Sequence, residues 1–259
     1  MNASTIDAAI TALKEEVSVE IAITPVVLRE AYELRHQVYC VERGFEEGKD
    51  GMERDEYDNF ARHAVVRWRQ TGEVVGTVRL ILPQSPARGD EFPIYRVCDS
   101  ALFQSLPMNT IGEVSRFALA KQNTKQVRSI SPASFSLLRL ALIQGAVRLS
   151  AEAGHTHWLA VMEPTLLRLL RATGIHFTPL GAMVEYHGLR QPSVAELAPM
   201  LSRMAEEQPI IWDFLTQGGT WYKASRPKSP RYPRMGVKRT PIQRSPVREN
   251  TRLMEEAKV

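Results

Sequence analysis

The sequence predicts a mixed α/β domain in which helices and strands are packed in layers. Three observations lead to this prediction. Segments with apolar residues at helical spacing are interleaved along the chain with short apolar segments typical of strands. The 259 residues are 44% hydrophobic and 24% charged, as in an ordinary globular protein with a packed core. Turn residues such as Gly72, Gly154 and Gly174 stand at the ends of the periodic segments.

In the first half of the chain, a helical extension is expected before a short strand and a second helix, which Pro25 opens. A glycine- and acid-rich loop separates this helix from two strands, which form a hairpin around Thr71-Gly72. These segments are 1–18, 19–24, 25–45, 44–60, 62–70 and 73–83.

In the second half, strands and helices alternate, as in layered α/β proteins. A strand is followed by a basic loop, a long helix that Gly154 ends, a second strand and a helix with Pro164 near its start. One or two further strands and a helical segment that breaks near Pro209 complete the pattern. These segments are 113–120, 121–132, 134–153, 155–162, 164–174, 175–188 and 193–218.

The positive charge of the chain is concentrated at its C-terminal end. Residues 225–259 contain ten Lys and Arg, three Asp and Glu, and five prolines, so their net charge is +7. The whole chain has a net charge of +4, which leaves −3 for the other residues. The remainder is therefore mildly acidic, which argues against a nucleic-acid-binding domain. We predict an N-terminal helical extension (1–18), one main domain (19–224) and a basic, proline-rich disordered tail (225–259).

Other features restrict the class of protein. Cys40 and Cys98 have no metal-ligand spacing and form no disulfide framework, so both are expected to be reduced thiols. No segment approaches 18 uncharged apolar residues, and the N-terminus lacks a basic leader. These observations predict a cytoplasmic protein with no transmembrane segment and no metal site.

The segment "EVSRFALA" (113–120) places two charged residues at the start of an apolar strand. Because side chains alternate along a strand, Glu113 is expected on one face and Arg116 on the other. One interpretation is an edge strand with solvated charges. The alternative is a buried network in which Asp55 and Asp58 neutralise Arg79 and Arg116.

The order of these motifs resembles the autoinducer-synthase branch of the GNAT-like acyltransferases. This branch comprises acyl-homoserine-lactone synthases and N-acyl amino acid synthases, and the nearest likeness is to acyltransferases of bacterial exosortase (PEP-CTERM) systems. The resemblance covers about residues 19–215 and includes "LRHQVYCVE", "DEYD" and "EVSRF". Its motifs are Arg35-x-x-x-Tyr39, Asp55-x-x-Asp58, Gly76-x-x-Arg79-Leu80 and Glu113-x-Ser115-Arg116-Phe117.

The resemblance implies a three-layer αβα fold around a strongly twisted mixed sheet. It also implies that an acyl thioester lies where two parallel strands splay apart, here near 113–120 and 157–162. The donor in this branch is usually an acyl carrier protein, whose phosphopantetheine carries the acyl group, although acyl-CoA is possible. No tightly bound cofactor is expected. Lys121, Lys125 and Arg128 follow the first strand and could contact an acidic carrier protein.

The expected reaction is attack of an amine on a thioester carbonyl. Glu113 is the candidate general base, and partial burial would raise its pKa toward neutrality. Arg79 and Arg116 are expected to orient the site, and Arg35 to hold an acceptor carboxylate. The expected substrate-binding residues are Arg35, Tyr39, Phe45, Asp55, Asp58, Ser115 and Phe117.

Lactone synthases commonly carry a tryptophan after this helix, in the pocket for S-adenosylmethionine, whereas this chain has Tyr39 and Phe45. This difference favours an amino acid or another small amine as the acceptor. Two alternatives are a lactone synthase that uses S-adenosylmethionine and a non-catalytic adaptor whose basic tail binds nucleic acid or membrane.

Overall fold

The computed structural model describes residues 3–84 and 92–222, so the predicted tail lies outside the described residues. The helices in the described residues are α1 (Ala3–Glu16), α2 (Pro25–Arg35), α3 (Lys121–Ile130), α4 (Pro132–Ala153), α5 (Pro164–Ala172), α6 (Leu197–Glu207) and α7 (Pro209–Thr216). The strands are β1 (Val17–Ile21), β2 (Ala61–Trp68), β3 (Val74–Ile81), β4 (Ile111–Leu119), β5 (His157–Met162), β6 (Thr178–Pro179), β7 (Val184–Glu185) and β8 (Leu189–Glu196). A π-helical segment, His36–Glu42, continues α2.

The strands form one mixed sheet in the order β1-β2-β3-β4-β5-β8-β6, and β7 pairs with β8. β1 to β4 are antiparallel neighbours, as are β5 and β8 and the short β6 and β8. β4 and β5 are parallel neighbours, joined through α3 and α4. The hairpin expected from 62–83 is β2–β3, and the mixed α/β class is confirmed.

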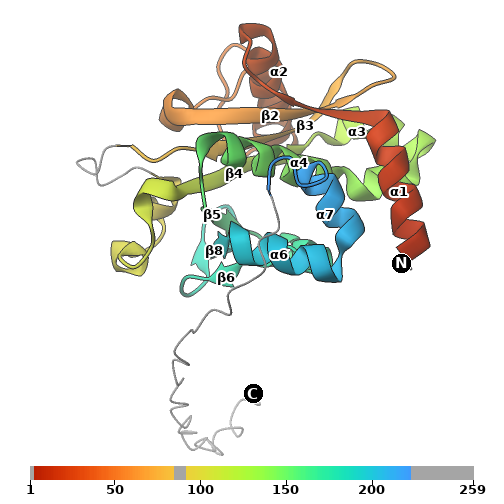
Figure 1. Cartoon of the computed structure of the whole chain (residues 1–259). Coiled ribbons are helices and arrows are strands. Elements are labelled where there is room, and N and C mark those ends of the chain that lie inside the picture. The colour runs from red at the N-terminus through yellow and green to blue at the C-terminus, as the bar shows by residue number, and fades with distance from the viewer. Residues whose placement is uncertain (1–2, 85–91, 223–259) are drawn as a thin grey trace, which may run out of the picture. The chain divides into compact units, whose positions relative to one another are not determined.

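Helices cover both faces of the sheet (Figure 1). Successive side chains of β2 point to opposite faces of the sheet. Ala64 and Val66 pack in the core under α1 and α4, whereas Val65 packs under α2. Gly145 lets α4 approach the sheet closely, since a Cβ there would lie 2.8 Å from the Ala64 Cβ. Ile10 of α1 is buried in the same core, so the N-terminal helix is part of the packed body.

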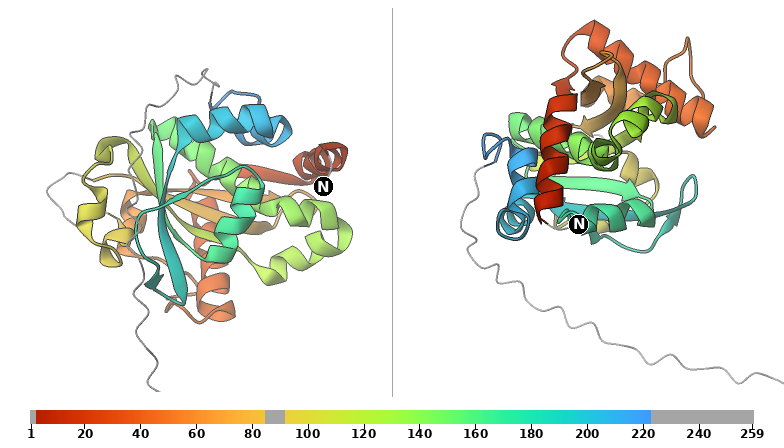
Figure 2. Two further views of the ribbon diagram at one scale, coloured as in Figure 1. Left: turned by 90° about the horizontal axis from the view of Figure 1, so that it is seen from below. Right: turned by 90° about the vertical axis from the view of Figure 1, so that its right-hand side faces the viewer.

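The parallel pair β4–β5 is joined over only three positions. Ile111, Gly112 and Glu113 pair with His157, Trp158 and Leu159, and no strand pairing follows between them. Beyond Glu113 the two strands diverge, which Figure 2 shows from below. The splayed strands expected near 113–120 and 157–162 are therefore present, and they open one edge of β4 in the middle of the sheet.

Two segments differ from the sequence prediction. Residues 121–130 form helix α3 rather than a loop, with Thr124 and Val127 buried beneath an otherwise polar surface. Because only two positions of this helix are buried, its sequence shows no clear apolar period and resembles that of a polar loop. The second difference is β8, which occupies the start of the segment predicted as helical. Pairing with β5 and β6 holds this stretch extended despite its Pro192.

Among the described residues, no helix combines the length and the apolar character that crossing a membrane requires.

Candidate active site

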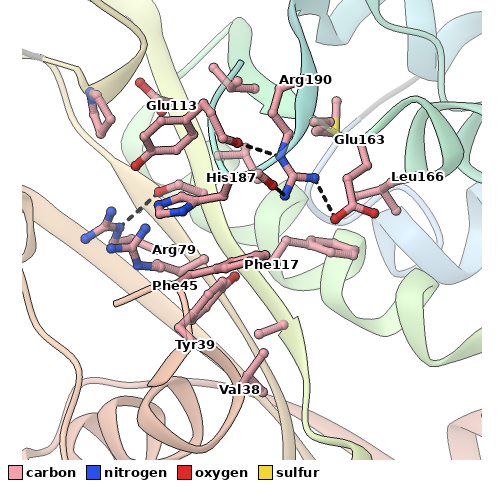
Figure 3. Close-up of a pocket in the computed structure, with 18 of the residues that line it drawn as sticks. Val38, Tyr39, Phe45, Arg79, Glu113, Phe117, Glu163, Leu166, His187 and Arg190 are labelled. Atoms are coloured by element: carbon pink, nitrogen blue, oxygen red, sulfur yellow. Dashed lines mark hydrogen bonds and ion pairs between the residues drawn. The ribbon is translucent and has the colours of Figure 1, made fainter. Parts of the chain in front are cut away.

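A cavity of about 320 Å³ lies at the point where β4 and β5 diverge. Its lining comes from β4, β5, β8, α5 and the π-helical segment (Figure 3). Seven of the predicted catalytic and substrate-binding residues contribute to it. They are Tyr39, Phe45, Arg79, Glu113, Ser115, Arg116 and Phe117.

Glu113 is the last residue of β4 that pairs with β5, and its side chain enters the cavity at the apex of the split. The residue is 3% exposed, and its Oε2 accepts a hydrogen bond from the Ile94 backbone N–H at 3.0 Å. Burial raises the pKa of Glu113 to about 7, although the Ile94 bond and the nearby Arg79 and Arg116 oppose the rise. A carboxyl group with this pKa can accept a proton at neutral pH.

A network of buried ion pairs forms the wall of the cavity next to Glu113. Arg79 Nη1 contacts Asp55 at 2.5 Å and Asp58 at 2.8 Å. Arg116 pairs with Asp55 at 3.1 Å, so the network predicted from the sequence is confirmed. Burial alone would raise the pKa of Asp58. Arg35 and Arg79 stabilise its carboxylate form, and they hold the pKa of Asp58 well below its usual range.

Two further acids complete the network. Glu53 is 2% exposed, and it accepts from Arg35 Nε at 2.6 Å and from Arg116 Nη2 at 2.8 Å. Glu46 contacts Arg116 Nη2 at 3.3 Å. Sequence reasoning missed both residues, because they lie in the acid-rich loop among several similar residues. The two predicted arginines were already balanced by the two predicted aspartates, so the sequence offered no signal for further acids until the structure showed that Arg35 is buried as well.

The structure corrects the role predicted for Arg35. Its guanidinium is fully buried, with Nε on Glu53 and two nitrogens on Asp58, and it does not line the cavity. Arg35 is therefore unavailable to hold an acceptor carboxylate. Asp55 and Asp58 likewise lie behind the cavity wall, where they hold Arg79 and Arg116 rather than face a substrate.

An irregularity in β4 brings Arg116 to this network. Thr77 pairs with Ala118 but Arg79 pairs with Ser115, so β4 carries one extra residue as a bulge. Arg116 has a φ of 47°, an uncommon conformation for a residue with a side chain. The bulge places its guanidinium on Glu53, and it leaves Ser115 Oγ to accept from Arg79 Nε at 3.0 Å. Ser115 therefore positions Arg79.

Aromatic side chains and a second group of charged residues line the side of the cavity that faces the buried network. Phe45 stacks on His187, with ring centroids 4.7 Å apart, and the Tyr39 ring lies 5.2 Å from the Arg116 guanidinium carbon. Glu163 pairs with Arg43 at 3.1 Å and with Arg190 at 2.5 Å. Sequence reasoning missed His187, Glu163 and Arg190, since the fold alone brings β7, β8 and the end of β5 to this cavity.

The other end of the cavity is apolar. Phe117 and Leu119 project from β4, Met162 from β5 and Leu166 from α5, and buried Trp158 closes the floor. The cavity thus joins a charged end at Glu113 to an apolar end suited to a hydrocarbon chain.

The three predicted docking residues lie outside the cavity, on the exposed surface of α3. Lys121, Lys125 and Arg128 are spaced by four and three residues, so the helix brings all three to one face. In the part of the chain that the structure describes, no group of His, Cys, Asp and Glu residues has the arrangement of a metal site.

Residues 34–129 match the family model described as "Acetyltransferase (GNAT) domain". No curated protein sequence matches the chain. Among solved structures, the AHL synthase LasI shares 20% identity, with a TM-score of 0.54, over 71% of this chain and 93% of LasI. The CoA-dependent acyl-homoserine lactone synthase BjaI, solved with SAM and isopentyl-CoA, shares 20% identity, with a TM-score of 0.52, over 78% of this chain and 88% of BjaI.

FeeM, an N-acyl amino acid synthase from uncultured soil microbes, shares 14% identity, with a TM-score of 0.51, over 72% of this chain and 93% of FeeM. The chain therefore has the GNAT fold, and its structural neighbours are those of the branch that its motifs resemble. The match to the domain model favours an acyltransferase of the GNAT kind.

Proposed function

We propose that this protein is an N-acyltransferase that moves a fatty acyl group from an acyl carrier protein thioester to the amine of an amino acid or a similar small acceptor. The observation that carries the proposal is the position of Glu113. A buried carboxyl group with a pKa of about 7 stands where a charged and an apolar end of one cavity meet. Amide formation from a thioester needs a base at this junction.

In the proposed reaction, the acyl chain lies along Phe117, Met162 and Leu166, and the thioester carbonyl lies beside β4. An aliphatic amine is mostly protonated at neutral pH, and the Glu113 carboxylate removes its proton directly or through one water. The neutral amine attacks the carbonyl carbon, the C–S bond breaks as the tetrahedral intermediate collapses, and the departing thiolate takes up the proton that the nitrogen loses. Backbone N–H groups of β4 between Phe117 and Leu119, on the edge without a strand partner, stabilise the developing oxyanion.

Arg79 and Arg116 support this reaction without taking part in bond formation. Their ion pairs fix the wall beside Glu113, and their positive charge stabilises the carboxylate form of Glu113 against its burial. Tyr39 and Phe45 border the acceptor. The donor is proposed to dock on α3, and the proposed location is the cytoplasm, where the exosortase-associated acyltransferases that the motifs resemble would meet acyl carrier protein.

A lactone synthase that uses S-adenosylmethionine is the second candidate, because LasI and BjaI are acyl-homoserine lactone synthases and BjaI was solved with SAM. Phe45 in place of the expected tryptophan argues for the first candidate. Release of methylthioadenosine from S-adenosylmethionine would establish the second.

The decisive experiment is to overexpress the protein and to identify new acylated amines in cell extracts by mass spectrometry. The purified protein is then assayed with acyl carrier protein and CoA thioesters of the same acyl chain. The proposal predicts an N-acyl amino acid or N-acyl amine that is absent with Glu113→Gln. An unchanged extract and no turnover of either thioester would contradict it.

A further inference from the structure

The charged residues around the polar end of the cavity divide into two groups of opposite net charge. The buried network holds four carboxylates, from Glu46, Glu53, Asp55 and Asp58, against the three guanidinium groups of Arg35, Arg79 and Arg116. Its balance is one negative charge. His63 beside it stays neutral, because burial lowers its pKa to about 3.

The second group has the opposite balance. Among the residues that the structure describes, Glu163 is the single carboxylate that pairs with Arg43 and Arg190, which leaves one positive charge. All three side chains line the cavity. Arg190 and Glu163 lie together on one side of the cavity, and Arg79 of the network lies on the other (Figure 3). Phe45 and His187 stand between the groups, since Arg43 lies over the Phe45 ring and His187 Nε2 is 3.9 Å from Glu46.

Arg190 is held as a rigid binding group. Its Nε donates to the Tyr186 carbonyl at 3.1 Å, and its Nη2 donates to the His187 carbonyl at 2.7 Å. These bonds anchor the guanidinium to the β7–β8 turn, and its side chain is 11% exposed. By contrast, the Glu163 side chain is 42% exposed and can turn to solvent. A fixed guanidinium with a removable carboxylate partner is suited to exchange that partner for a ligand carboxylate.

We propose that the acceptor's carboxylate binds between Arg190 and Arg43, where it replaces Glu163, and that these two arginines select an α-amino acid over an amine without a carboxylate. The ammonium group of the same acceptor then points into the cavity that Glu113 also lines. This inference rests on the proposed function and assigns its acceptor site.

The test uses the full-length protein with a saturating acyl thioester, and it compares each proteinogenic L-amino acid with its own α-carboxamide. The measured quantity is the ratio of kcat/KM for the acid to kcat/KM for the amide. The ratio of a variant is divided by that of the wild type, so the different amine basicities of acid and amide cancel. Arg190→Gln and Arg43→Gln should each lower the ratio about 10- to 100-fold, as expected for one charge-assisted hydrogen bond.

Glu163→Gln should change the ratio in the opposite direction, by lowering KM for the amino acid, because a competing carboxylate is gone. If the Glu163 ion pair had a purely structural role, Glu163→Gln would instead lower kcat/KM for the acid and for the amide by the same factor. The matched controls are Arg148→Gln and Glu152→Gln. Each of these variants breaks the Arg148–Glu152 ion pair on α4, which has an N···O distance of 2.9 Å and side chains about as exposed as those of Arg43 and Glu163. This pair lies outside the cavity, so both variants should leave the ratio unchanged.

If acylation occurs but Arg190→Gln and Arg43→Gln leave the acid-to-amide ratio unchanged, the carboxylate site is elsewhere and the inference is overturned, while the proposed function stands. If no acceptor is acylated, the proposed function itself fails. Arg43 is 44% exposed, so Arg43→Gln keeps the test valid if Arg190→Gln does not fold.

Discussion

At the scale of single residues, Glu113 combines two properties that rarely occur together. It is buried among groups that exclude water, yet it faces a cavity that a substrate can enter. The unfavourable burial of its charge keeps part of the population protonated at neutral pH. A carboxyl group at the surface would be a far weaker base.

Replacement of Glu113 by Gln should lower kcat by roughly 10²–10⁴, the usual contribution of a general base. The amide keeps the shape and the Ile94 N–H contact, so the fold should persist. In the wild type, kcat/KM should rise with pH through about 7, as the Glu113 carboxyl loses its proton. Single-turnover acylation across pH measures both effects, and a folded variant that acylates at the wild-type rate would remove Glu113 from the mechanism.

The same carboxyl group makes stability depend on pH. Its pKa is about 7 in the folded chain against 4.5 for an unperturbed glutamate, so the folded state binds more protons than the unfolded state between these two values. Stability from this group is therefore present at low pH and is lost as pH rises toward 7. The free energy of unfolding of the wild type, relative to Glu113→Gln, should fall by about 3 kcal/mol over this range.

Urea unfolding of both proteins at a series of pH values measures this difference. Contributions from His63 and the network acids occur in both proteins and cancel. A difference that does not vary with pH would show that Glu113 titrates as an ordinary exposed carboxyl.

At the scale of elements, the charge network fastens together segments that are distant in sequence. Asp58 lies in the short 3₁₀ helix Glu56–Phe60 before β2, Arg79 in β3, Arg35 in α2 and Arg116 in the bulge of β4. A buried ion pair costs much desolvation free energy, and the removal of one partner leaves an uncompensated charge. The network therefore fixes the arrangement of these elements more than it adds net stability.

Arg79→Ala and Asp58→Ala should each destabilise the protein by about 3–5 kcal/mol, because the side chains that form this pair are almost completely buried. The double variant should be less destabilised than the sum. The pair Arg148–Glu152 on α4 is the exposed control, with an expected coupling of about 0.3–0.5 kcal/mol. Additive denaturation midpoints for Arg79 and Asp58 would contradict a coupled network.

Helix α3 gives the donor prediction a definite geometry. Lys121, Lys125 and Arg128 form one face of a helix that follows directly on the splayed strand β4. Reversal of all three to Glu should raise KM for acyl carrier protein at least about 10-fold at low salt, since rim charges mainly promote encounter. Turnover of a saturating short acyl-pantetheine should hardly change. Equal use of acyl carrier protein by variant and wild type would place the docking surface elsewhere or indicate CoA as the donor.

The sequence predicted those parts of the site that lie within continuous motifs, and it missed those that the fold assembles. Glu113, Arg79, Arg116 and the two aspartates were found because charges in apolar strands are costly and need partners. Glu163 and Arg190 were not, because each is an ordinary charged residue until β8 pairs with β5. Arg35 was assigned the wrong role, since spacing on a helix does not show whether a guanidinium faces a cavity or a buried acid.

At the scale of the whole molecule, the layered α/β arrangement followed from the order of periodic segments, and the main hairpin from its turn residues. The helix α3 and the strand β8 were missed for opposite reasons. α3 buries too little to show a clear apolar period, and β8 is extended only because its neighbours on the sheet require it. Pairing between distant segments is the information that local pattern lacks.

The three-position junction of β4 and β5 also has a consequence for motion. It joins two antiparallel blocks of the sheet. The first block is β1, β2, β3 and β4, and the second is β5, β8 and β6. Their junction is the shortest pairing between the major strands of the described sheet. Such blocks can open as separate cooperative units with different free energies. Amide hydrogen exchange should therefore resolve two classes of protected amides, and a bound acyl thioester should slow exchange on both sides of the split, at 114–119 and 160–162. One common rate of opening for both blocks, unaffected by the thioester, would mean that the two blocks behave as a single rigid unit.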